Sequence, residues 1–335
     1  MPKKYKMIVL TDHTTHAMQE SIYPLLKTMS MNTRCESINV VSRGNPNNDD
    51  FFYNYSSTEV YSVRVTNNFI YSLEGDQYIK NTQRNSINDF DILFLRLDMP
   101  VKNSFFKFLV NNYNENNIIN NPSGIMYTGD KDFLLNFKSI CPTMQLCKNI
   151  EDILLFKKYF PIVLKPIHSY GGKGMIKIDN DTLWYENVKH QFSDFLPELA
   201  SNLNKYNYLA MEYLQRVSEG DKRIIIVNGK IMGATLRYPK DGSWICNLSM
   251  GGSSHFAEPD DDERRIAETI SPKILQHGVV IYGFDTLVGN NGRRLLSEIN
   301  THNVGGLLEA ELHSKKPIVQ ETSDLIWNYI YEKNK

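Results

Sequence analysis

The sequence predicts an α/β fold, with α+β character in its last part. Near the N-terminus, apolar runs at residues 7–10 and 91–95 alternate with helical patterns, and short crossovers of this kind favour a mostly parallel sheet. Further along the chain, Asn228 and Gly229 separate two apolar runs, and this dipeptide is a strong signal for a tight antiparallel hairpin. We therefore expect a parallel sheet first and antiparallel strands later.

The pattern divides the chain into three regions. Residues 1–122 form an expected N-terminal α/β domain, residues 123–206 a central region with a glycine-rich hairpin, and residues 207–335 a C-terminal region of antiparallel strands. The polar segment 45–50 is expected to be a loop. Helices are expected at about 104–114, 130–137, 150–158, 261–277 and 319–331.

Composition favours a soluble enzyme over a nucleic-acid-binding or membrane protein. The net charge of −1 offers no basic surface to nucleic acid, and no apolar run approaches the roughly 20 residues that span a bilayer. The N-terminus enters its first strand without the pattern of a signal peptide. The 4 cysteines are scattered, which indicates reduced thiols and a cytoplasmic location.

Three oxygen-bearing side chains stand on two apolar runs in the C-terminal region. Glu298 and Asn300 are two residues apart at the end of one run, and Asp285 lies inside the run before it. Residues i and i+2 of a strand point to the same face, so these side chains can meet. Such a set suits Mg²⁺ that substrate phosphates also hold. A single carboxylate at a strand end is commonly only solvated, so the neighbouring motifs decide the interpretation.

A glycine-rich turn joins two predicted strands of the central region. Lys165 ends the first strand, and Tyr170, Gly171, Gly172 and Gly174 follow in the turn. Backbone N–H groups of such a turn can surround phosphate oxygens, with lysine supplying positive charge. The turn is not a P-loop, because no Gly-Lys-Ser/Thr opens a helix here. Taken alone, it also fits an ordinary hairpin.

Two arginines stand on the strands around the Asn-Gly hairpin. Arg223 leads into the first strand's apolar run, and Arg237 lies on the returning strand, so both guanidinium groups can face one anion. Planar guanidinium donors bind phosphate and carboxylate oxygens in pairs. Each arginine alone also fits a surface ion pair.

The order of these motifs carries a resemblance. The series comprises Lys131, Lys165, the glycine-rich turn, residues 212–214, residues 220–223, Arg237, Asp285, Glu298 and Asn300, together with residues 96–100, 120–123 and 141–143. In this order the chain resembles an ATP-grasp ligase and, more closely, the prokaryotic glutathione synthetase family, over nearly its whole length. The resemblance implies an ATP-grasp fold and a small-molecule or peptide substrate with a carboxylate and an amine acceptor.

The resemblance also implies roles for residues. It implies that ATP is bound by Lys131, Lys165, Tyr170, Gly171, Gly172, Gly174, Glu212, Tyr213, Leu214 and Asp221. It implies that Mg²⁺, or Mn²⁺ in its place, is bound by Asp285, Glu298 and Asn300, and that Arg223 and Arg237 are catalytic. ATP would convert a carboxylate into an acyl phosphate, which an amine then attacks. Family members are commonly tetramers or dimers, so a homo-oligomer is expected.

The substrate side departs from the family pattern. A Ser-Pro step of the family is replaced by Asn303 and Val304, and Trp244 stands near the place where an arginine is usual. The residues expected to bind substrate are Asp12, Arg96, Asn247, Asn303, Gly305 and Gly306. The nucleotide elements are intact, so the sequence supports ATP-dependent ligation more strongly than it supports glutathione as the product.

Several alternatives stay open. Asp12 precedes a turn that is expected to open a helix, whose N-terminus suits a substrate carboxylate. Arg96 can bind the same group or pair with Asp98. His302 fits a base for the amine, a ligand for a substrate carboxylate or a loop residue bonded to backbone. The function has three alternatives: glutathione synthesis, another ATP-grasp ligation of an amino acid or peptide, and a nucleotide-binding module without catalysis.

Overall fold

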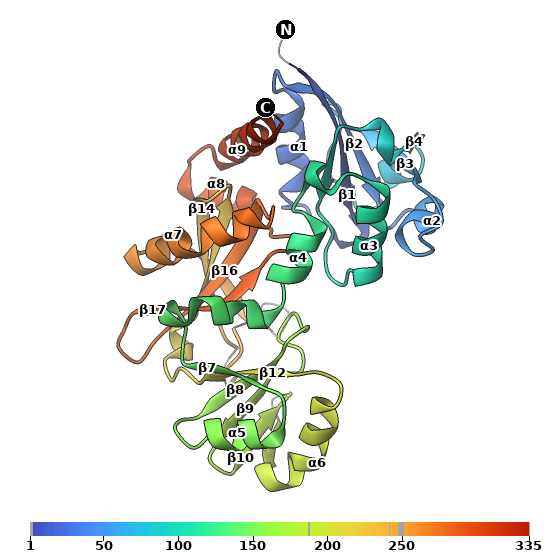
Figure 1. The fold of residues 1–335 in the computed structure, drawn as a ribbon. Coiled ribbons are helices and arrows are strands. Elements are labelled where there is room, and N and C mark those ends of the chain that lie inside the picture. Colours follow the sequence, from blue (N-terminus) through green and yellow to red (C-terminus); the bar gives the residue numbers. More distant parts are fainter. Residues whose placement is uncertain (1–2, 187, 241, 247–250, 335) are drawn as a thin grey trace.

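In the part of the chain that the structure describes, three β-sheets follow one another along the sequence. A computed structural model describes residues 3–186, 188–240, 242–246 and 251–334, and their strands form two six-stranded sheets and one five-stranded sheet. Figure 1 shows the first and third sheets in the upper part of the molecule and the second sheet in a lower lobe.

The first sheet is mostly parallel, as expected for the N-terminal region. Its strands are β1 (Tyr5–Thr11), β2 (Cys35–Ser42), β3 (Glu59–Arg64), β4 (Gln83–Ser86), β5 (Ile92–Leu95) and β6 (Ile118–Ile119). In the order β4-β3-β2-β1-β5-β6, β1 lies parallel to β2 and β5, while β3 and β4 form an antiparallel edge. The helices are α1 (Ile22–Ser30), α2 (Asp49–Phe52), α3 (Asn103–Asn112) and α4 (Pro122–Thr128).

The second sheet is antiparallel and contains the glycine-rich turn. Its strands are β7 (Met144–Cys147), β8 (Ile162–Pro166), β9 (Ile176–Asp179), β10 (Thr182–Tyr185), β11 (Val188–Gln191) and β12 (Tyr208–Glu212), and its helices are α5 (Ile150–Phe156) and α6 (Phe192–Leu203). The expected hairpin is confirmed, because β8 and β9 pair on either side of the turn. β12 pairs with β7 and β8, so this sheet extends beyond the division expected after residue 206.

The third sheet is antiparallel and has the order β15-β14-β13-β16-β17. Its strands are β13 (Asp221–Val227), β14 (Lys230–Tyr238), β15 (Ser253–Ala257), β16 (Ile281–Val288) and β17 (Arg294–Asn300), and its helices are α7 (Asp261–Gln276), α8 (Leu307–Ser314) and α9 (Ile318–Lys333). Asn228 and Gly229 have φ angles of 46° and 78°, as a tight type I′ hairpin requires.

The first and third sheets share a hydrophobic core. One cluster joins buried residues of α1, β1 and β2 to residues of β13, β16, α8 and α9. Figure 1 shows α9, at the C-terminal end, beside α1, and the Trp327 indole donates to the Met29 carbonyl oxygen at 3.1 Å. The second region has a separate cluster of buried residues, all between Cys147 and Ala210.

One expectation for local structure is wrong, and another differs in the type of helix. The loop expected at 45–50 contains a 3₁₀ turn and the start of α2, because the Asn45 side chain caps that turn. The helix expected at 130–137 is a 3₁₀ segment, Lys131–Ile140, in which Phe137 has non-helical dihedral angles. The helical pattern therefore indicated a helical segment here, but not its type.

Candidate functional site

A row of four alternating charges crosses the third sheet. β13 and β14 pair Asp221 with Arg237, and β13 and β16 pair Arg223 with Asp285, so all four side chains share one face. Arg237 donates to the two Asp221 oxygens at 2.6 and 2.8 Å. Arg223 donates to the two Asp285 oxygens at 2.7 and 2.8 Å. Arg237 also lies 2.9 Å from Asp285, so both arginines face one carboxylate.

Burial and pairing act in opposite directions on the two carboxylates. Burial by itself raises the pKa of Asp285, but the charges of Arg223 and Arg237 outweigh it and hold the pKa well below its usual range. Burial and the neighbouring Asp285 charge raise the pKa of Asp221. Asp285 is therefore ionised at neutral pH, and its charge is balanced by the two guanidinium groups.

The three side chains expected to bind a metal meet at the end of this row. β16 and β17 pair Asp285 with Glu298, and Asn300 follows two residues later on β17. The amide of Asn300 donates to Asp285 at 3.3 Å. The Glu298 carboxylate makes no hydrogen bond or ion pair with any residue that the structure describes. Glu298 is half-buried and lines both of the cavities described below.

Two buried lysines lie near the end of the row, Lys165 on the second sheet and Lys131 on the 3₁₀ segment before it. Lys165, on β8, donates from Nζ to the Ser297 carbonyl oxygen at 3.0 Å and so links the second sheet to β17. Lys131 donates from Nζ to the carbonyl and hydroxyl oxygens of Ser169, just before the glycine-rich turn. Burial lowers the pKa of Lys131, with Glu298 acting against this change and Lys165 adding to it.

The glycine-rich turn covers a cavity of about 210 Å³ that faces the charge row. Gly171 and Gly172 line one side of this cavity, and the four charged side chains of the row line the other. Gly171, Gly172 and Gly174 have φ angles of 65°, 75° and 71°, which side-chain-bearing residues rarely adopt. The cavity thus combines cations, oxygen ligands and a glycine backbone, the combination that binds phosphate groups.

A smaller apolar cavity of about 60 Å³ lies at the end of β12. Glu212, Tyr213 and Leu214 line it together with Trp244. The Tyr213 backbone N–H donates to the Pro161 carbonyl oxygen at 2.8 Å, so it is already engaged. The Trp244 indole N–H is buried and has no hydrogen-bond partner among the described residues. An apolar slot with few polar groups suits a flat aromatic ring.

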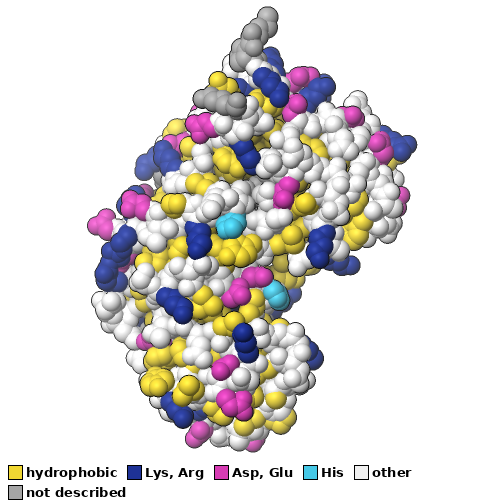
Figure 2. Space-filling view, viewed as in Figure 1, with side chains coloured by type: hydrophobic (Ala, Val, Ile, Leu, Met, Phe, Trp, Pro, Cys, Tyr) yellow, Lys and Arg dark blue, Asp and Glu magenta, His cyan; other side chains and the backbone are white. Residues whose placement is uncertain are grey.

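A cleft of about 850 Å³ lies between the N-terminal region, the glycine-rich turn and the third sheet. Its walls are formed by residues 98–104, 168–170 and 298–304, and Arg223 also lines it. Figure 2 shows the surface hollowed between the lower lobe and the N-terminal part. We call the cavity of about 210 Å³ under the glycine-rich turn the phosphate-sized cavity. Because Arg223 and Glu298 line both this cavity and the cleft, the two spaces meet at these residues.

Of the residues expected to bind substrate, Asn303 lies in the cleft. Its Nδ2 donates to Asp98 at 2.7 Å, and its Oδ1 is buried without a partner among the described residues. Gly305 and Gly306 follow in the same loop but do not line the cleft, and Gly306, with a φ of 93°, precedes α8. Asn247 lies outside the described residues.

Asp12 lies outside the cleft, in a turn after β1. The prediction of a helix directly after Asp12 is wrong, because His13–Thr15 is a three-residue 3₁₀ turn and α1 begins only at Ile22. The Asp12 carboxylate caps this turn, accepting from the Thr14 backbone at 3.1 Å, and it also accepts from Arg43 at 2.8 Å. The Asp12 carboxylate therefore occupies the place at this turn where a substrate anion was expected to bind.

Arg96 is 1% exposed, after β5. One guanidinium nitrogen donates to the Val304 carbonyl oxygen at 3.0 Å, while Nε and Nη1 have no partner among the described residues. The alternative ion pair with Asp98 is not formed, since Asp98 accepts from Thr15 and Asn303 instead. Arg96 therefore tethers the loop after β17 to the first sheet.

His302 forms part of the cleft wall. Its ring stacks on Phe106 with the centroids 6.1 Å apart. Burial lowers the pKa of His302 to about 4. The imidazole is therefore neutral at physiological pH and is a weak base.

Comparison with known proteins places this site in a family. The model described as "prokaryotic glutathione synthetase, ATP-grasp domain" matches residues 130–315, which include both lysines, the glycine-rich turn and the whole charge row. The chain belongs to this family. It is similar to the glutathione synthetase of Bradyrhizobium diazoefficiens, with 26% identity over 70% of this chain and 72% of the relative. It is also similar to that of Buchnera aphidicola subsp. Schizaphis graminum, with 29% identity over 77% and 79%.

Solved structures share the fold over almost the entire chain. D-cycloserine synthetase DcsG has a TM-score of 0.63 and 13% identity, covering 97% of this chain and 99% of its own. A RiPP-associated ATP-grasp ligase from Chryseobacterium gregarium, in complex with ADP and a leader and core peptide, has a TM-score of 0.60, 14% identity and 97% coverage of each chain. The ATP-grasp fold is thereby confirmed.

The family match also confirms the expected activity class, an ATP-dependent carboxylate–amine ligase. ATP-grasp ligases act on small-molecule or peptide substrates. Among the described residues, no helix is long and apolar enough to span a bilayer.

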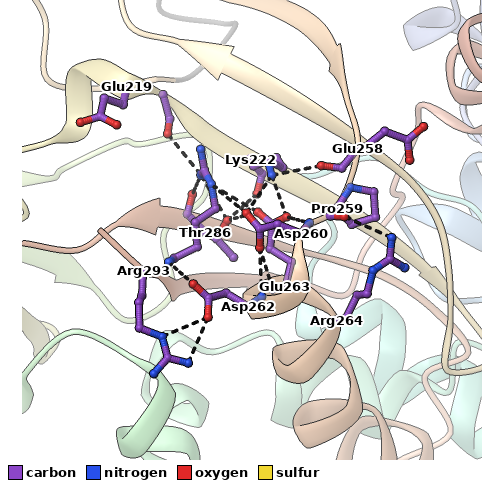
Figure 3. Close-up of polar contacts among 12 residues, drawn as sticks. Glu219, Lys222, Glu258, Pro259, Asp260, Asp262, Glu263, Arg264, Thr286 and Arg293 are labelled. Atoms are coloured by element: carbon purple, nitrogen blue, oxygen red, sulfur yellow. Dashed lines mark hydrogen bonds and ion pairs between the residues drawn. The ribbon is translucent and has the colours of Figure 1, made fainter. Parts of the chain in front are cut away.

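Behind the charge row, this ATP-grasp ligase has a buried ionic network that the sequence analysis missed (Figure 3). Lys222 points away from Arg223 and donates to Glu263 at 2.8 Å, and Thr286 donates to the other Glu263 oxygen at 2.8 Å. Glu263 is 0% exposed and forms a capping box with Asp260 at the start of α7. The network holds α7 against β13 and β16, the strands that carry the row. The Asp-x-x-Glu spacing of Asp260 and Glu263 is typical of a capping box, and it is the sequence pattern from which the start of α7 could have been predicted.

Two further residues of the cleft were not predicted from the sequence. Asp130 and His168 contact each other, with Oδ1 and Nδ1 2.7 Å apart, and both line the cleft. They stand 38 positions apart in the sequence, so no local pattern could have paired them.

Proposed function

We propose that this ATP-grasp ligase is a glutathione synthetase, which joins the cysteine carboxylate of γ-glutamylcysteine to the amine of glycine and converts ATP to ADP and phosphate. The observation that supports this most directly is the family match over residues 130–315. Relatives named glutathione synthetase align over about 70% or more of this chain, which adds support.

The chemistry requires that the carboxylate be activated first. A carboxylate is a poor acylating agent, because oxide would have to leave. Phosphorylation by ATP produces an acyl phosphate, from which phosphate leaves readily when an amine attacks. Water must be kept away, because it hydrolyses an acyl phosphate, and closure of the glycine-rich turn over the phosphate-sized cavity serves this purpose.

On the nucleotide side, adenine would occupy the apolar cavity at Glu212, Tyr213 and Leu214. The triphosphate would extend into the phosphate-sized cavity under the glycine-rich turn. Cations at phosphate oxygens and positive-φ glycines around them support this assignment. The remaining residues assigned to ATP are Lys131, Lys165, Tyr170, Gly171, Gly172, Gly174 and Asp221.

The donor set at the end of the charge row fits Mg²⁺, with Mn²⁺ as an alternative. Glu298 and Asn300 offer oxygen atoms where the two cavities meet, and Asp285 offers another once Arg223 and Arg237 turn to phosphate oxygens. Two carboxylates and an amide, shared with phosphates, are a usual environment for Mg²⁺. The ion would neutralise phosphate charge during phosphoryl transfer. The two arginines would stabilise the acyl phosphate and the tetrahedral intermediate.

The acyl substrate would lie in the 850 Å³ cleft, next to Glu298 and Asn303. Arg96 would act on it through the loop that it tethers at Val304. Asp12, Gly305 and Gly306 remain predicted substrate residues, although none of them lines the cleft. Asn247 also remains a prediction and lies outside the described residues.

A second candidate is an ATP-grasp ligase that joins another amino acid or a peptide. It is favoured by Asn303 and Val304 in the substrate loop and by Trp244 near the place of a family arginine. The similar fold of the Chryseobacterium gregarium ligase, which binds a leader and core peptide, is compatible with it. A nucleotide-binding module without catalysis is disfavoured, because Lys131 and Glu298 are both present.

We also propose a cytoplasmic enzyme that forms a homo-oligomer and works through the three sequence regions 1–122, 123–206 and 207–335. Support for the cytoplasm comes from Cys35, Cys141, Cys147 and Cys246, which are all free and buried.

The deciding experiment is ADP release by the purified enzyme with Mg²⁺-ATP and γ-glutamylcysteine, with and without glycine, followed by the mass of the product. Glycine-dependent ADP and the tripeptide mass would establish glutathione synthesis. Without turnover, a panel of other amino acids and peptides would test the second candidate.

A further inference from the structure

Asp130 and His168 form a pair at the wall of the substrate cleft. His168 follows β8, and Asp130 precedes the 3₁₀ segment that begins at Lys131. The Asp130 Oδ1 and His168 Nδ1 atoms lie 2.7 Å apart. Both residues line the same cleft as Glu298 and Arg223, although neither belongs to the nucleotide cavities described above.

The pairing decides which ring nitrogen of His168 carries the proton. An ionised carboxylate only accepts hydrogen bonds, so the ring donates from Nδ1 and leaves Nε2 with a lone pair. The His168 side chain is 68% exposed, so Nε2 is accessible from the cleft. A carboxylate that orients a histidine in this way is the arrangement of many general bases.

The ligase reaction needs such a base. An amine acceptor reaches the enzyme mainly as an ammonium ion at neutral pH, and in that form its nitrogen has no lone pair for attack. We propose that His168 is the general base that deprotonates the acceptor amine, and that Asp130 is the residue that positions it. This inference rests on the proposed carboxylate–amine ligation.

Nε2 of His168 takes one proton from the ammonium group, and the freed lone pair forms a bond to the acyl carbon. The bond between this carbon and the phosphate oxygen breaks, and its electron pair leaves with the phosphate. The second nitrogen proton goes to the phosphate, which departs as hydrogen phosphate, and the imidazolium returns its proton to solvent.

The other groups around the cleft are less suited to this role. His302 is largely buried and its pKa is lowered to about 4, so it is too weak a base. Asp98 is engaged by Thr15 and Asn303. The remaining charged groups that line the cleft are Lys102, Arg223 and Glu298, with Lys131 bonded to the adjacent Ser169. Glu298 is the carboxylate assigned to the metal, which leaves His168 as the available base.

The test compares two acceptors in His168→Gln, Asp130→Asn and the wild type, each with Mg²⁺-ATP and γ-glutamylcysteine. Glycine needs deprotonation, whereas hydroxylamine is largely unprotonated at neutral pH and attacks without a base. With glycine, we expect His168→Gln to lower kcat by about 10²- to 10⁴-fold. With hydroxylamine, we expect hydroxamate formation within about 3-fold of wild type. Asp130→Asn should give the same split with a smaller loss, and His190→Gln, on β11, is the matched control.

The pH profile provides a second readout. In His168→Gln the glycine rate should rise continuously with pH, because only the free amine in solution then reacts. Equal losses with both acceptors would mean a structural role and would overturn the proposal, as would an unchanged glycine rate. If the wild type forms no tripeptide with glycine, the proposed function fails, and this inference fails with it.

Discussion

The second sheet and the rest of the molecule are stabilised in different ways. The first and third sheets, far apart in the sequence, share buried clusters. The second sheet has a core from one continuous segment, and among the described residues of its strands only Met144, Leu209 and Met211 join the shared clusters. The charge row stands on the shared body, and the glycine-rich turn and Lys165 stand on the second sheet. The candidate site therefore lies between two bodies whose cores are largely separate. We expect changes in the shared body to affect chemistry and changes in the second sheet to affect nucleotide binding.

The largest effect is expected from Glu298→Ala, on the shared body. The loss of this carboxylate should lower turnover by about 10³-fold or more, with little change in melting temperature because the side chain makes no hydrogen bond or ion pair with a described residue. ADP release and circular dichroism melting would measure the two effects. Glu268→Ala, on the exposed side of α7, is the matched control. Normal turnover of Glu298→Ala would remove the proposed site from consideration.

The separation of the two cores can be tested with one cavity in each. Leu183 and Ile326 are both 0% exposed, and replacing either by Ala should cost about 2–5 kcal/mol of local or global stability. In Leu183→Ala, faster hydrogen exchange should be confined to the second sheet and its helices. In Ile326→Ala, it should extend through α1, the first sheet and the third sheet. If Leu183→Ala loosens the entire chain, the two bodies form one cooperative unit.

A moderate effect is expected from Lys165→Ala, at the contact between the bodies. The substitution removes a cation from the phosphate-sized cavity and the hydrogen bond to Ser297. We expect the KM for ATP to rise about 10- to 100-fold, equivalent to about 1.4–2.7 kcal/mol, with a smaller change in kcat. Lys189→Ala, exposed on β11, should leave both constants unchanged. A larger effect on kcat than on KM would assign Lys165 to chemistry instead.

The smallest effect is expected from acid, which should lower the stability of the shared body through His302 and His16. Burial lowers the pKa of His302 and of His16 to about 4 from 6.5. The unfolded chain binds these protons below about pH 6.5 and the folded chain only near pH 4, so stability falls as the pH falls through this window. Each histidine should cost about 1–2 kcal/mol at pH 5 relative to pH 7. In melting experiments, His302→Gln should lose less stability between these pH values than the wild type.

Sequence reasoning succeeded where strand periodicity alone places side chains together. Glu298 and Asn300 share a face because they are two residues apart, and the Asn228-Gly229 hairpin pairs the strands that carry Asp221 and Arg237. The exact register is not set by the turn alone, because a register shift between Ile225 and Ile226 brings Arg237, rather than Leu236, opposite Asp221. The fold class and the strands that carry these side chains therefore follow from local rules, whereas the exact pairing in the charge row also depends on the register shift.

Prediction failed where position depends on distant parts of the chain. The Asp130–His168 contact requires two loops to meet, and the Arg96–Val304 hydrogen bond spans 208 positions. The short strands β10 and β11 were not expected either. Three of the four β11 residues are exposed in the described structure, so this strand carries no apolar alternation. The substrate side is therefore the part of the site that the sequence describes least.

The contact between α9 and α1 also affects the order of events during synthesis. Trp327 reaches Met29 across 298 positions, so the first sheet cannot complete its core until the last helix has left the ribosome. The second sheet, made from one continuous segment, can fold while translation continues. On the nascent chain, a compact central unit would then form between an unfinished start and an absent end. Premature termination before α9 would leave the apolar faces of α1 and β13 exposed.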